Sequence, residues 1–313
     1  MSANKDRKVG KVIWWNGKFV APEEAKTSVF THTLHYGLGA FEGIRCYKTS
    51  DGKLAVFKLR EHIERLFDSC KILELKIPYT AQEITDACCE TIRRSGLTEG
   101  VYIRPLVYIG DGPLGVFPGF NPPVEVAIMT WQWGAYLGQE AKDLGARIKI
   151  ASFSRGYINS SMSKAKAVGQ YMTGILAKLE VKRAGYDEAL LLDPNGLVSE
   201  GSGENIFIVK KGVLKTTPLT AAILNGITRD TIITLAKEEG LTVVEQSFTR
   251  DELYCADEAF FSGTAAEITP IREVDNRPVG EGKPGAITKK LSEKYFDCVL
   301  GKNPKHKEWL TFV

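Results

Sequence analysis

Two lysines stand among small residues near the middle of the chain, in "SMSKAKAVGQYMTG", residues 161–174. The stretch reads as the opening of a helix, and a lysine on a helix usually lies on a solvated face. The alanine and glycine neighbours of Lys166, however, leave room for a bulky flat group to approach the backbone. A lysine in a poorly solvated pocket loses proton affinity, and its neutral amine can form a Schiff base with a carbonyl. The residues alone leave both interpretations of Lys164 and Lys166 open.

Two carboxylates, Glu200 and Glu204, precede an apolar strand in "SEGSGENIF", residues 199–207. A tight turn with solvated acids is the ordinary interpretation, and GxG spacing alone is a weak phosphate signal. A carboxylate at the start of a strand is also what a pyridinium nitrogen needs as a partner. The stretch is therefore a candidate for holding a protonated ring nitrogen.

Two further stretches offer backbone N–H groups to an anion. In "LNGITRDTI", residues 224–232, Gly226 precedes a helix that Thr228 or Asp230 would cap. The free N–H groups and positive dipole end of such a helix bind phosphate readily. In "SGTAAEITP", residues 262–270, small residues follow an apolar strand and form a similar patch.

Aromatic residues and one isolated arginine complete the chemical inventory. "THTLHYGLGAFEGIRCY", residues 31–47, is either a packed loop or the wall of a pocket that Tyr36 and Phe41 line. Arg104 lies in the apolar strand "YIRPL". A charge there is costly unless it is paired, so a structural salt bridge is the first expectation for Arg104.

These residues need elements that position them, and the chain offers both strands and helices. A hairpin is predicted over 11–20 with Asn16-Gly17 as its turn. Thr80 as a cap and Gly96 as a stop delimit one helix. Further helices are predicted over 60–75, around Lys166 as far as Gly185, and over 228–240, and strands over 101–110, 124–133, 146–153, 188–193, 204–209 and 258–263.

The length of 313 residues suits two domains. "GAYLGQEAKDLG", residues 134–145, is glycine-rich and breaks the periodicity, so it is the best linker. We predict a small N-terminal α/β domain over 1–137, an interdomain loop over 138–146, and a larger, mixed β-barrel-like C-terminal domain over 147–313. The order of strands and helices predicts an α+β (mixed α/β) fold.

Composition and charge exclude several classes of protein. The chain is 43% hydrophobic and 25% charged, which is ordinary for a globular protein, and its net charge is +3 without a basic tract, so no nucleic-acid partner is expected. No segment has the length and apolarity of a signal peptide or a membrane span, which predicts a cytoplasmic protein without a membrane partner. The six cysteines show no CxxC spacing and the four histidines no ligand pattern, so reduced thiols and no metal site are expected.

Six motifs together resemble the branched-chain amino acid aminotransferases, of pyridoxal-phosphate fold type IV. They are "HYGLGAFEGIR", "YIRPL", "AKAVGQY", "SEGSGENIF", "GITRD" and "SGTAAEITP". The motifs occur in the family's order and span most of the chain, from about residue 12 to about residue 296. "HYGLGAFEGIRCY" and "WGAYLG" make the bacterial form the nearer likeness.

The resemblance implies roles for individual residues. Lys166 would carry pyridoxal 5'-phosphate covalently, whereas Lys164 falls where the family tolerates a small residue. Glu200 would face the pyridine nitrogen and Tyr171 the phenolic oxygen. The phosphate would be held by Arg65, Ile227, Thr228 and Thr264. The substrate pocket would be lined by Tyr36, Phe41, Tyr102, Trp133 and Tyr136, with space left by Gly43.

Further roles concern the substrate's carboxylates and the neighbouring subunit. Tyr102 with the Thr264–Ala265 backbone would hold the α-carboxylate. Arg104 would serve the second carboxylate of glutamate, which gives its awkward position a reason. Val116 belongs to a loop that in this family reaches into the neighbouring subunit's site, so a homo-oligomer is expected, either a dimer or a dimer-based hexamer. One departure is Val168, where close relatives more often have glycine.

The implied reaction transfers the amino group of leucine, isoleucine or valine to 2-oxoglutarate, giving branched-chain 2-oxo acids and L-glutamate, reversibly. Rivals of the same fold are a D-amino acid aminotransferase, an (R)-selective amine transaminase and aminodeoxychorismate lyase. "YIRPL" and "GDGPLGV" favour the branched-chain type over the other transaminases. A non-catalytic binding module is the remaining alternative, and it predicts a colourless protein.

Overall fold

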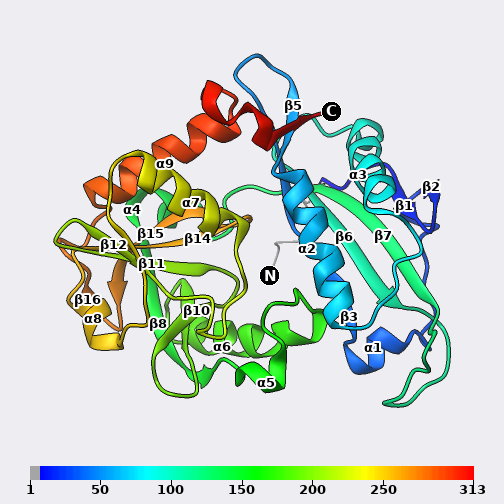
Figure 1. Cartoon of the computed structure of the whole chain (residues 1–313), viewed down its shortest axis with the longest axis horizontal. Helices are drawn as coiled ribbons and strands as arrows, with labels where there is room; N and C mark the ends of the chain where they lie inside the picture. The colour runs from blue at the N-terminus through cyan, green and yellow to red at the C-terminus, as the bar shows by residue number, and fades with distance from the viewer. Residues whose placement is uncertain (1–7) are drawn as a thin grey trace. The chain divides into compact units, whose positions relative to one another are not determined.

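Residues 8–313 are described by the structure, a computed structural model, and they fall into two units (Figure 1). Unit 1 runs to Gly134 and also takes in Ala165–Gly169 and Cys298–Val313. Unit 2 comprises Ala135–Lys164 and Gln170–Asp297. Two short segments that follow the predicted linker therefore belong to unit 1, and one of them contains Lys166. The domain boundaries drawn from the sequence, 1–137, 138–146 and 147–313, stay a prediction.

An antiparallel sheet forms unit 1, in the order β17-β5-β4-β6-β7-β1-β2 with β3 beside β6. The predicted hairpin turn is confirmed, since Asn16 and Gly17 both have positive φ, 47° and 86°, as this kind of turn requires. The strands are β1 (Ile13–Trp15), β2 (Lys18–Val20), β3 (Gly39–Phe41), β4 (Ile44–Lys48), β5 (Leu54–Phe57), β6 (Val101–Ile109), β7 (Val124–Gln132) and β17 (Leu310–Phe312).

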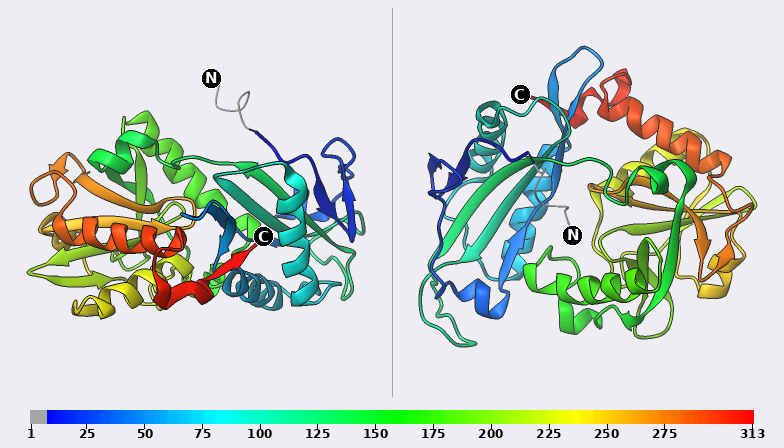
Figure 2. Two further views of the ribbon diagram at one scale, coloured as in Figure 1. Left: turned by 90° about the horizontal axis from the view of Figure 1, so that it is seen from above. Right: turned by 180° about the vertical axis from the view of Figure 1, so that it is seen from behind.

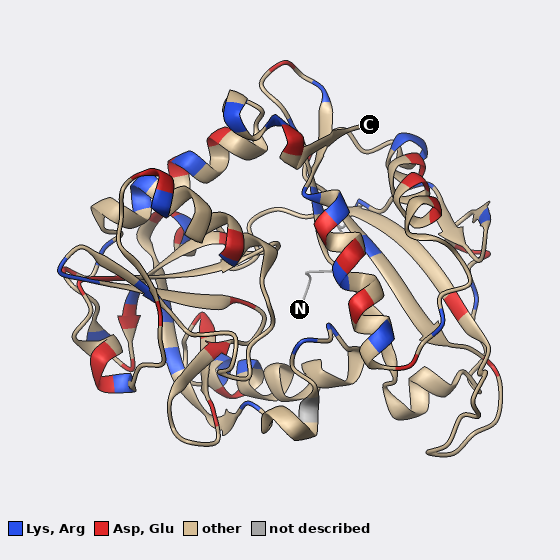
Figure 3. Ribbon diagram, viewed as in Figure 1, with Lys and Arg blue, Asp and Glu red and all other residues tan. Residues whose placement is uncertain are grey.

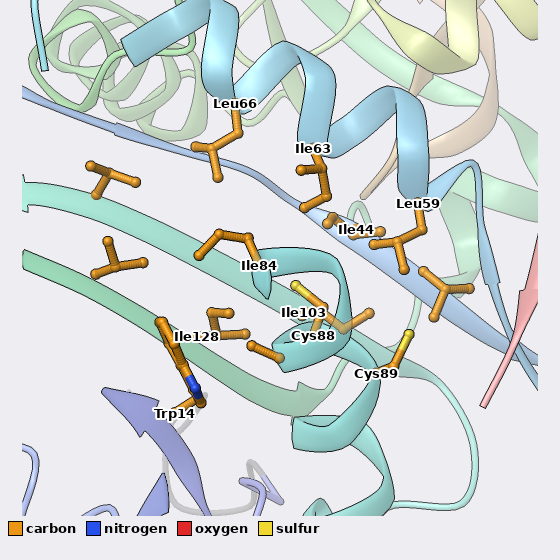
Figure 4. Packing of buried hydrophobic residues seen from close by; sticks show 14 of the residues in the cluster. Trp14, Ile44, Leu59, Ile63, Leu66, Ile84, Cys88, Cys89, Ile103 and Ile128 are labelled. Atoms are coloured by element: carbon orange, nitrogen blue, oxygen red, sulfur yellow. The ribbon is translucent and has the colours of Figure 1, made fainter. Parts of the chain in front are cut away.

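The two faces of this sheet differ in character because side chains alternate along a strand. On β6, Val101, Ile103 and Val107 join the core beneath the helices, so Tyr102 and Arg104 point to the other face. The helices of unit 1 are α1 (His32–Tyr36), α2 (Leu59–Ile72) and α3 (Ala81–Ser95). Figure 4 shows the helix-side core, where residues of α2 and α3 meet the sheet: Leu59, Ile63, Leu66, Ile84, Cys88, Ile44, Ile103 and Ile128.

Helix α3 begins and ends where the sequence predicts. Thr80 accepts a hydrogen bond from the Glu83 backbone N–H, and the Glu83 side chain accepts one from the Thr80 N–H, which completes a capping box. Gly96 ends the helix with φ 72°, a left-handed conformation that glycine adopts at little cost. The cap and stop are thus local sequence signals that the fold follows.

A mixed sheet forms unit 2, in the order β10-β9-β8-β15-β14-β11-β12-β13 with β16 beside β15. The pairs β8/β9, β8/β15 and β12/β13 are parallel, and the other pairs are antiparallel. The strands are β8 (Ala146–Ser154), β9 (Glu188–Leu192), β10 (Val198–Gly201), β11 (Asn205–Lys210), β12 (Val213–Thr216), β13 (Val243–Glu245), β14 (Glu258–Gly263), β15 (Glu267–Val274) and β16 (Arg277–Pro278).

Helices pack against this sheet, α6 against β8 and β9 and α7 against β14 (Figures 1 and 2). The remaining elements of the chain are α4 (Gln139–Leu144), α5 (Ile158–Ser161), α6 (Tyr171–Arg183), α7 (Ile227–Glu238), α8 (Arg250–Tyr254), α9 (Ala286–Val299) and the 3-10 turns η1 (Val168–Gln170) and η2 (Pro304–Trp309). The mixture of helices with antiparallel and mixed sheets confirms the α+β class.

Three local predictions are wrong. Lys166 does not lie on a helix, because residues 165–169 are bound to unit 1 and α6 begins only at Tyr171. The predicted linker is not all loop, since α4 forms within it. The N-cap position of helix α7 is Gly226 and not Thr228 or Asp230, which lie within the helix.

Basic and acidic residues are interspersed along the ribbon of both units (Figure 3). Within residues 8–313, every helix is too short or too polar to cross a bilayer. No cluster of three or more histidine, cysteine or acidic side chains in that range is arranged to hold a metal ion.

Candidate active site

The backbone around Lys166 is fixed to unit 1 by hydrogen bonds on both sides of the residue. Its N–H donates to Ser69 Oγ of α2 at 2.9 Å, and its carbonyl accepts from the Phe41 N–H at 3.1 Å. Ala167 forms a bridge with Ala40, which continues the edge of β3. Because these groups bond to the sheet and to α2, they are not available for a helix, and the extended backbone positions the lysine side chain.

Two glycines make this attachment possible. The Gly169 N–H donates to the Gly37 carbonyl at 3.0 Å. A Cβ on Gly169 would lie 3.2 Å from the Gly37 oxygen, and Gly37 itself has φ 72°. Gly169, the glycine of "AKAVGQY", is therefore required for the close approach of the two backbones. Val168, which stands where close relatives more often have glycine, packs beside Gly39.

The Lys166 side chain and the Arg104 guanidinium both contact the ring of Phe41. Lys166 Nζ is 5.0 Å from the centre of the Phe41 ring, and the Arg104 guanidinium is 4.5 Å from the same ring. Arg104 also stacks near Tyr102 and Trp131, at 5.4 and 5.3 Å. Favourable cation–π contact partly replaces water around the charge of Arg104.

The expected salt bridge of Arg104 is absent from the part of the chain that the structure describes. Its Nη2 donates to the Tyr102 hydroxyl at 3.3 Å, and its buried Nε has no hydrogen-bond partner there. Buried guanidinium N–H groups without an acceptor are costly, so this arrangement favours an anionic ligand at Arg104.

Gly43 is held to glycine by Tyr102. A Cβ on Gly43 would lie 1.8 Å from Tyr102 Oη and 2.7 Å from Cζ. Tyr102 is buried between Trp131 and Trp133, with ring centres 4.8 and 4.6 Å away. The absence of a side chain at Gly43 thus makes room for the Tyr102 hydroxyl beside Arg104.

A buried ion cluster on α2 supports this part of unit 1. Glu42 is fully buried and accepts two hydrogen bonds from Arg65, at 2.7 and 2.9 Å, and one contact from His62 Nδ1 at 2.7 Å. Burial raises the pKa of Glu42, but Arg65 and His62 outweigh burial and hold it well below its usual range. Burial lowers the pKa of His62, Glu42 opposes this effect, and Arg65 and Lys166 add to it. The two hydrogen bonds to Glu42 therefore fix the orientation of the Arg65 guanidinium.

Two predicted pocket residues lie elsewhere in unit 1, where they are strongly exposed. Val116 is 92% exposed and Tyr36 47% exposed. His32 connects their segments, because its ring stacks on Tyr36 at 4.6 Å and its Nε2 bonds to the Gly115 carbonyl at 2.8 Å.

In unit 2, Glu200 on β10 is buried and paired. Arg155 Nη2 lies 2.6 Å from Glu200 Oε1. Asn205 Nδ2 and the Leu224 N–H each donate to Oε2 at 3.1 Å. These hydrogen bonds fix the orientation of the Glu200 side chain, which is suited to accept from a protonated ring nitrogen.

Asn205 links this acid to the start of α7. Its amide also donates to the Leu224 carbonyl at 3.1 Å, and a Cβ on Gly226 would lie 2.0 Å from its Oδ1. The N-cap residue of α7 is Gly226, which has no side chain, and the positive dipole end of the helix at Ile227 and Thr228 is suited to an anion. A phosphate there and a pyridinium at Glu200 fit one phosphorylated pyridine.

The second lysine of the opening pair is bound to backbone. Lys164 Nζ donates to the carbonyls of Leu219 and Ile223, the latter at 2.8 Å. Burial lowers the pKa of Lys164, Glu200 opposes this, and Arg229 adds to it. Lys164 therefore has a structural role beside the Glu200 loop.

The structure distributes the predicted residues over the two units. Unit 1 holds Lys166, Arg65, Tyr36, Phe41, Gly43, Tyr102, Arg104, Val116 and Trp133. Unit 2 holds Tyr136, Tyr171, Glu200, Ile227, Thr228, Thr264 and Ala265. Tyr171 is the first residue of α6, and Thr264 and Ala265 connect β14 to β15.

The sequence did not identify the residues that support these groups. Glu42, His62 and Ser69 support the Lys166 side, and Arg155 and Asn205 support Glu200. Glu42 and Asn205 each lie within a motif, "FEGIR" and "GENIF", and their position there is the signal that was available.

Comparison with known proteins shows the family to which the chain belongs. The family model of amino-transferase class IV matches residues 39–274. A branched-chain-amino-acid aminotransferase of Pseudomonas aeruginosa is 51% identical over 302 residues, covering 96% of this chain and 97% of the relative.

Solved structures of branched-chain amino acid aminotransferases are similar to this chain in fold and in sequence. A branched-chain amino acid aminotransferase of Escherichia coli has a TM-score of 0.94 and 46% identity, and the match covers 96% of this chain and 98% of the other. The enzyme of the same name from Thermobaculum terrenum, solved in its PLP-bound holo-form, has a TM-score of 0.90 and 35% identity, with coverage of 97% and 99%. With these matches over nearly its whole length, the chain belongs to the class IV aminotransferases and has their fold, pyridoxal-phosphate fold type IV.

Proposed function

We propose that this protein is a branched-chain-amino-acid aminotransferase that uses pyridoxal 5'-phosphate. It exchanges the amino group of leucine, isoleucine or valine with 2-oxoglutarate, giving the branched-chain 2-oxo acid and L-glutamate. The observation that carries the proposal is the combination of a Lys166 whose backbone is bonded to α2 and β3 with a buried, ion-paired Glu200 near a helix whose N-cap is glycine. The near-complete coverage of relatives that bear this name supports it.

The cofactor supplies an aldehyde that reacts with amines and a ring that accepts electrons as the Cα–H bond breaks. Lys166 would anchor it covalently, and its Nζ amine would serve as the base for the proton on the substrate Cα. Glu200 would hold the protonated ring nitrogen, and Tyr171 the phenolic oxygen. The phosphate would be held by Arg65, the Ile227 and Thr228 N–H groups and Thr264.

Substrate selection rests on aromatic walls and one cation. Tyr36, Phe41, Trp133 and Tyr136 suit a branched apolar side chain, and Gly43 leaves space in the proposed pocket for the Tyr102 hydroxyl. Tyr102 and the Thr264–Ala265 backbone receive the α-carboxylate. Arg104, whose buried Nε lacks an acceptor within the described chain, receives the second carboxylate of glutamate.

The proposal includes a cytoplasmic homo-oligomer, in which the loop around Val116 completes a neighbouring subunit's pocket. The 92% exposure of Val116 and the exposed rings of Phe117 and Phe120 beside it support such a contact. The six cysteines are free thiols, as is usual in a reducing compartment.

A half-reaction assay tests the function directly. The holoenzyme is mixed with L-leucine, D-leucine and a simple amine, and the cofactor absorbance is followed. We expect L-leucine and L-glutamate to convert the cofactor to its amine form, and D-leucine and the amine to react at least tenfold more slowly. Conversion by D-leucine or by the amine but not L-leucine would favour the rival transaminases, and no conversion at all would reject transamination.

The two lysines give a matched pair of variants. Lys166→Ala should abolish the half-reaction, and borohydride treatment of wild-type enzyme should label the peptide that contains Lys166. Lys164→Met should retain borohydride labelling, because Lys164 Nζ donates to the carbonyls of Leu219 and Ile223 and so has a structural role. Labelling that follows Lys164 instead would refute the assignment.

A further inference from the structure

Two acids and a lysine meet beneath the loop that follows Glu200, and no step above uses them. Glu188 on β9 is fully buried, and its Oε1 accepts from Ser202 Oγ and from the Ala189 N–H, both at 2.7 Å. Lys178 of α6 donates to Glu188 Oε2. One carboxylate and one ammonium are thus paired and hydrogen-bonded.

The second acid, Glu204, lacks a counter-charge of its own within the described chain. It is 3% exposed, and its Oε2 accepts from the Gly203 N–H at 3.0 Å. Its Oε1 is buried without a hydrogen-bond partner among the described residues. The two acids approach the same turn, because the adjacent residues Ser202 and Gly203 donate to Glu188 and to Glu204 respectively. Two buried carboxylates are thus held at one turn, and a proton on Glu204 would satisfy the oxygen that lacks a partner among the described residues.

Charge balance points the same way. Two buried carboxylates opposite one ammonium leave an uncompensated negative charge, which is strongly unfavourable in a poorly solvated interior. Burial raises the pKa of Glu204, Glu188 raises it further, and Lys178 only partly opposes them. Tyr136 also faces the two acids and Tyr171, and burial followed by Glu204 and Glu188 raises its pKa, so it stays neutral.

The cluster holds the loop between Glu200 and Asn205. The Gly201 N–H donates to the Glu204 carbonyl at 2.7 Å, and Ser202 bonds to Glu188. A Cβ on Gly174 of α6 would lie 2.7 Å from the Ser202 carbonyl oxygen, so α6 presses on the same loop. Displacing the Glu204 side chain, which accepts from the Gly203 N–H, would therefore disturb the loop that joins Glu200 to Asn205.

We propose that Glu204 and Glu188 share one proton opposite Lys178, and that this neutral cluster is a positioning device for Glu200. The positioning role rests on the proposed function, because that function gives Glu200 its task. The shared proton does not rest on it, and the two parts are tested separately.

Thermal unfolding of the full chain without cofactor tests the shared proton. A carboxyl whose pKa is raised in the folded state binds more protons when folded, so its contribution to stability falls as pH rises above 4.5. Glu204→Gln keeps a neutral hydrogen-bonding side chain but has no proton to lose. We expect the Tm of Glu204→Gln minus the Tm of wild type to increase by several degrees between pH 5 and pH 8.

Glu239→Gln is the matched control, because Glu239 lies on the surface between Lys290 and Lys294, whose hydrogen bonds lower its pKa. Its Tm difference from wild type should not grow above pH 5. A Tm difference for Glu204→Gln that is flat over the same range would overturn the shared proton.

Half-reaction rates of the holoenzyme with L-leucine test positioning. We expect Glu204→Ala to lower the rate at least tenfold and Glu204→Gln to stay within threefold of wild type. Equal losses in both variants, or none in either, would overturn positioning by a neutral hydrogen bond. If Glu204→Ala does not fold, a loss above threefold in Glu204→Gln alone overturns it. A wild type inactive with leucine would refute the proposed function, while the Tm series would still decide the shared proton.

Discussion

At the scale of single residues, the most informative feature is a charge placed among rings. Arg104 contacts Phe41, Tyr102 and Trp131, and its Nε lacks an acceptor within residues 8–313. A purely structural arginine in an apolar strand would be expected to pair with a carboxylate. The geometry instead leaves this guanidinium prepared for an anionic ligand.

Substituting Arg104 should separate the two kinds of substrate. Arg104→Ala, and the longer Arg104→Met, should raise the KM for L-glutamate and 2-oxoglutarate about 10- to 100-fold, the value of a charge-assisted hydrogen bond. The KM for leucine should change less than about threefold, because leucine has no second carboxylate. Steady-state kinetics with both substrates measure this, and equal losses for both would reject the role.

A second residue prediction concerns the space at Gly43. Gly43→Ala would place a Cβ against the hydroxyl of the buried Tyr102, so the ring must shift. Overpacking of this kind costs about 1–3 kcal/mol. We expect the KM for leucine to rise about tenfold. Gly134→Ala, where a Cβ meets nothing within 4 Å, is the control and should leave the KM unchanged.

At the scale of elements, α2 serves both sides of unit 1. Its apolar face, with Leu59, Ile63 and Leu66, packs on the sheet. His62 and Arg65 reach Glu42, and Ser69 holds the Lys166 backbone. The helix therefore couples the stability of the core to the placement of the proposed nucleophile.

Removing the Glu42 charge should destabilise this element in a pH-dependent way. Glu42→Gln leaves Arg65 without its buried partner, at a cost of about 3–5 kcal/mol near neutral pH. Because the pKa of Glu42 is lowered, its contribution is present above pH 4.5 and is lost as pH falls. Urea unfolding of wild type and Glu42→Gln measures this effect. The difference between their free energies of unfolding should be smaller below pH 4.5 than at pH 7.

Glu64→Gln is the control on the same helix, since its ion pair with Arg60 is exposed. Exposed pairs contribute little to stability, so this variant should unfold close to wild type at both pH values. A difference for Glu42→Gln that grows on acidification would contradict the account.

At the scale of the whole molecule, helix α6 combines a buried face with an exposed apolar one. Ala177 and Val181 pack on β8 and β9, while Met172, Ile175, Leu176 and Leu179 are 66%, 57%, 42% and 46% exposed. Monomers rarely expose contiguous apolar patches of this kind. A second copy of the chain is the occupant that the proposed homo-oligomer supplies.

Ile175→Glu should therefore disrupt self-association. We expect wild type to sediment as a dimer or larger, and the variant to shift toward monomer with lower activity, because a charge at an apolar interface is costly. Arg183→Glu, exposed near the end of the same helix, should sediment like wild type. A monomeric wild type, or an Ile175→Glu variant of unchanged size, would contradict the prediction.

Local signals let the sequence by itself determine much of this protein. The Asn16-Gly17 turn, the Thr80 cap and the Gly96 stop depend on neighbouring residues, so they are readable without the fold. Six motifs identified the family, which the comparisons show. The proposed roles of Lys166, Glu200 and Arg104 came from the same motifs.

Only the tertiary structure decided what those residues touch. Lys166 leaves the helical pattern because Ser69 and Phe41, about 100 residues away, take its backbone hydrogen bonds. Arg104 meets rings instead of a carboxylate because β6 pairs with β3 and β7, which carry Phe41 and Trp131. The pairing of β9 with β10 likewise brings the turn that contains Glu204 to Glu188. Contacts of this range depend on register and burial, and no local pattern of residue types records them.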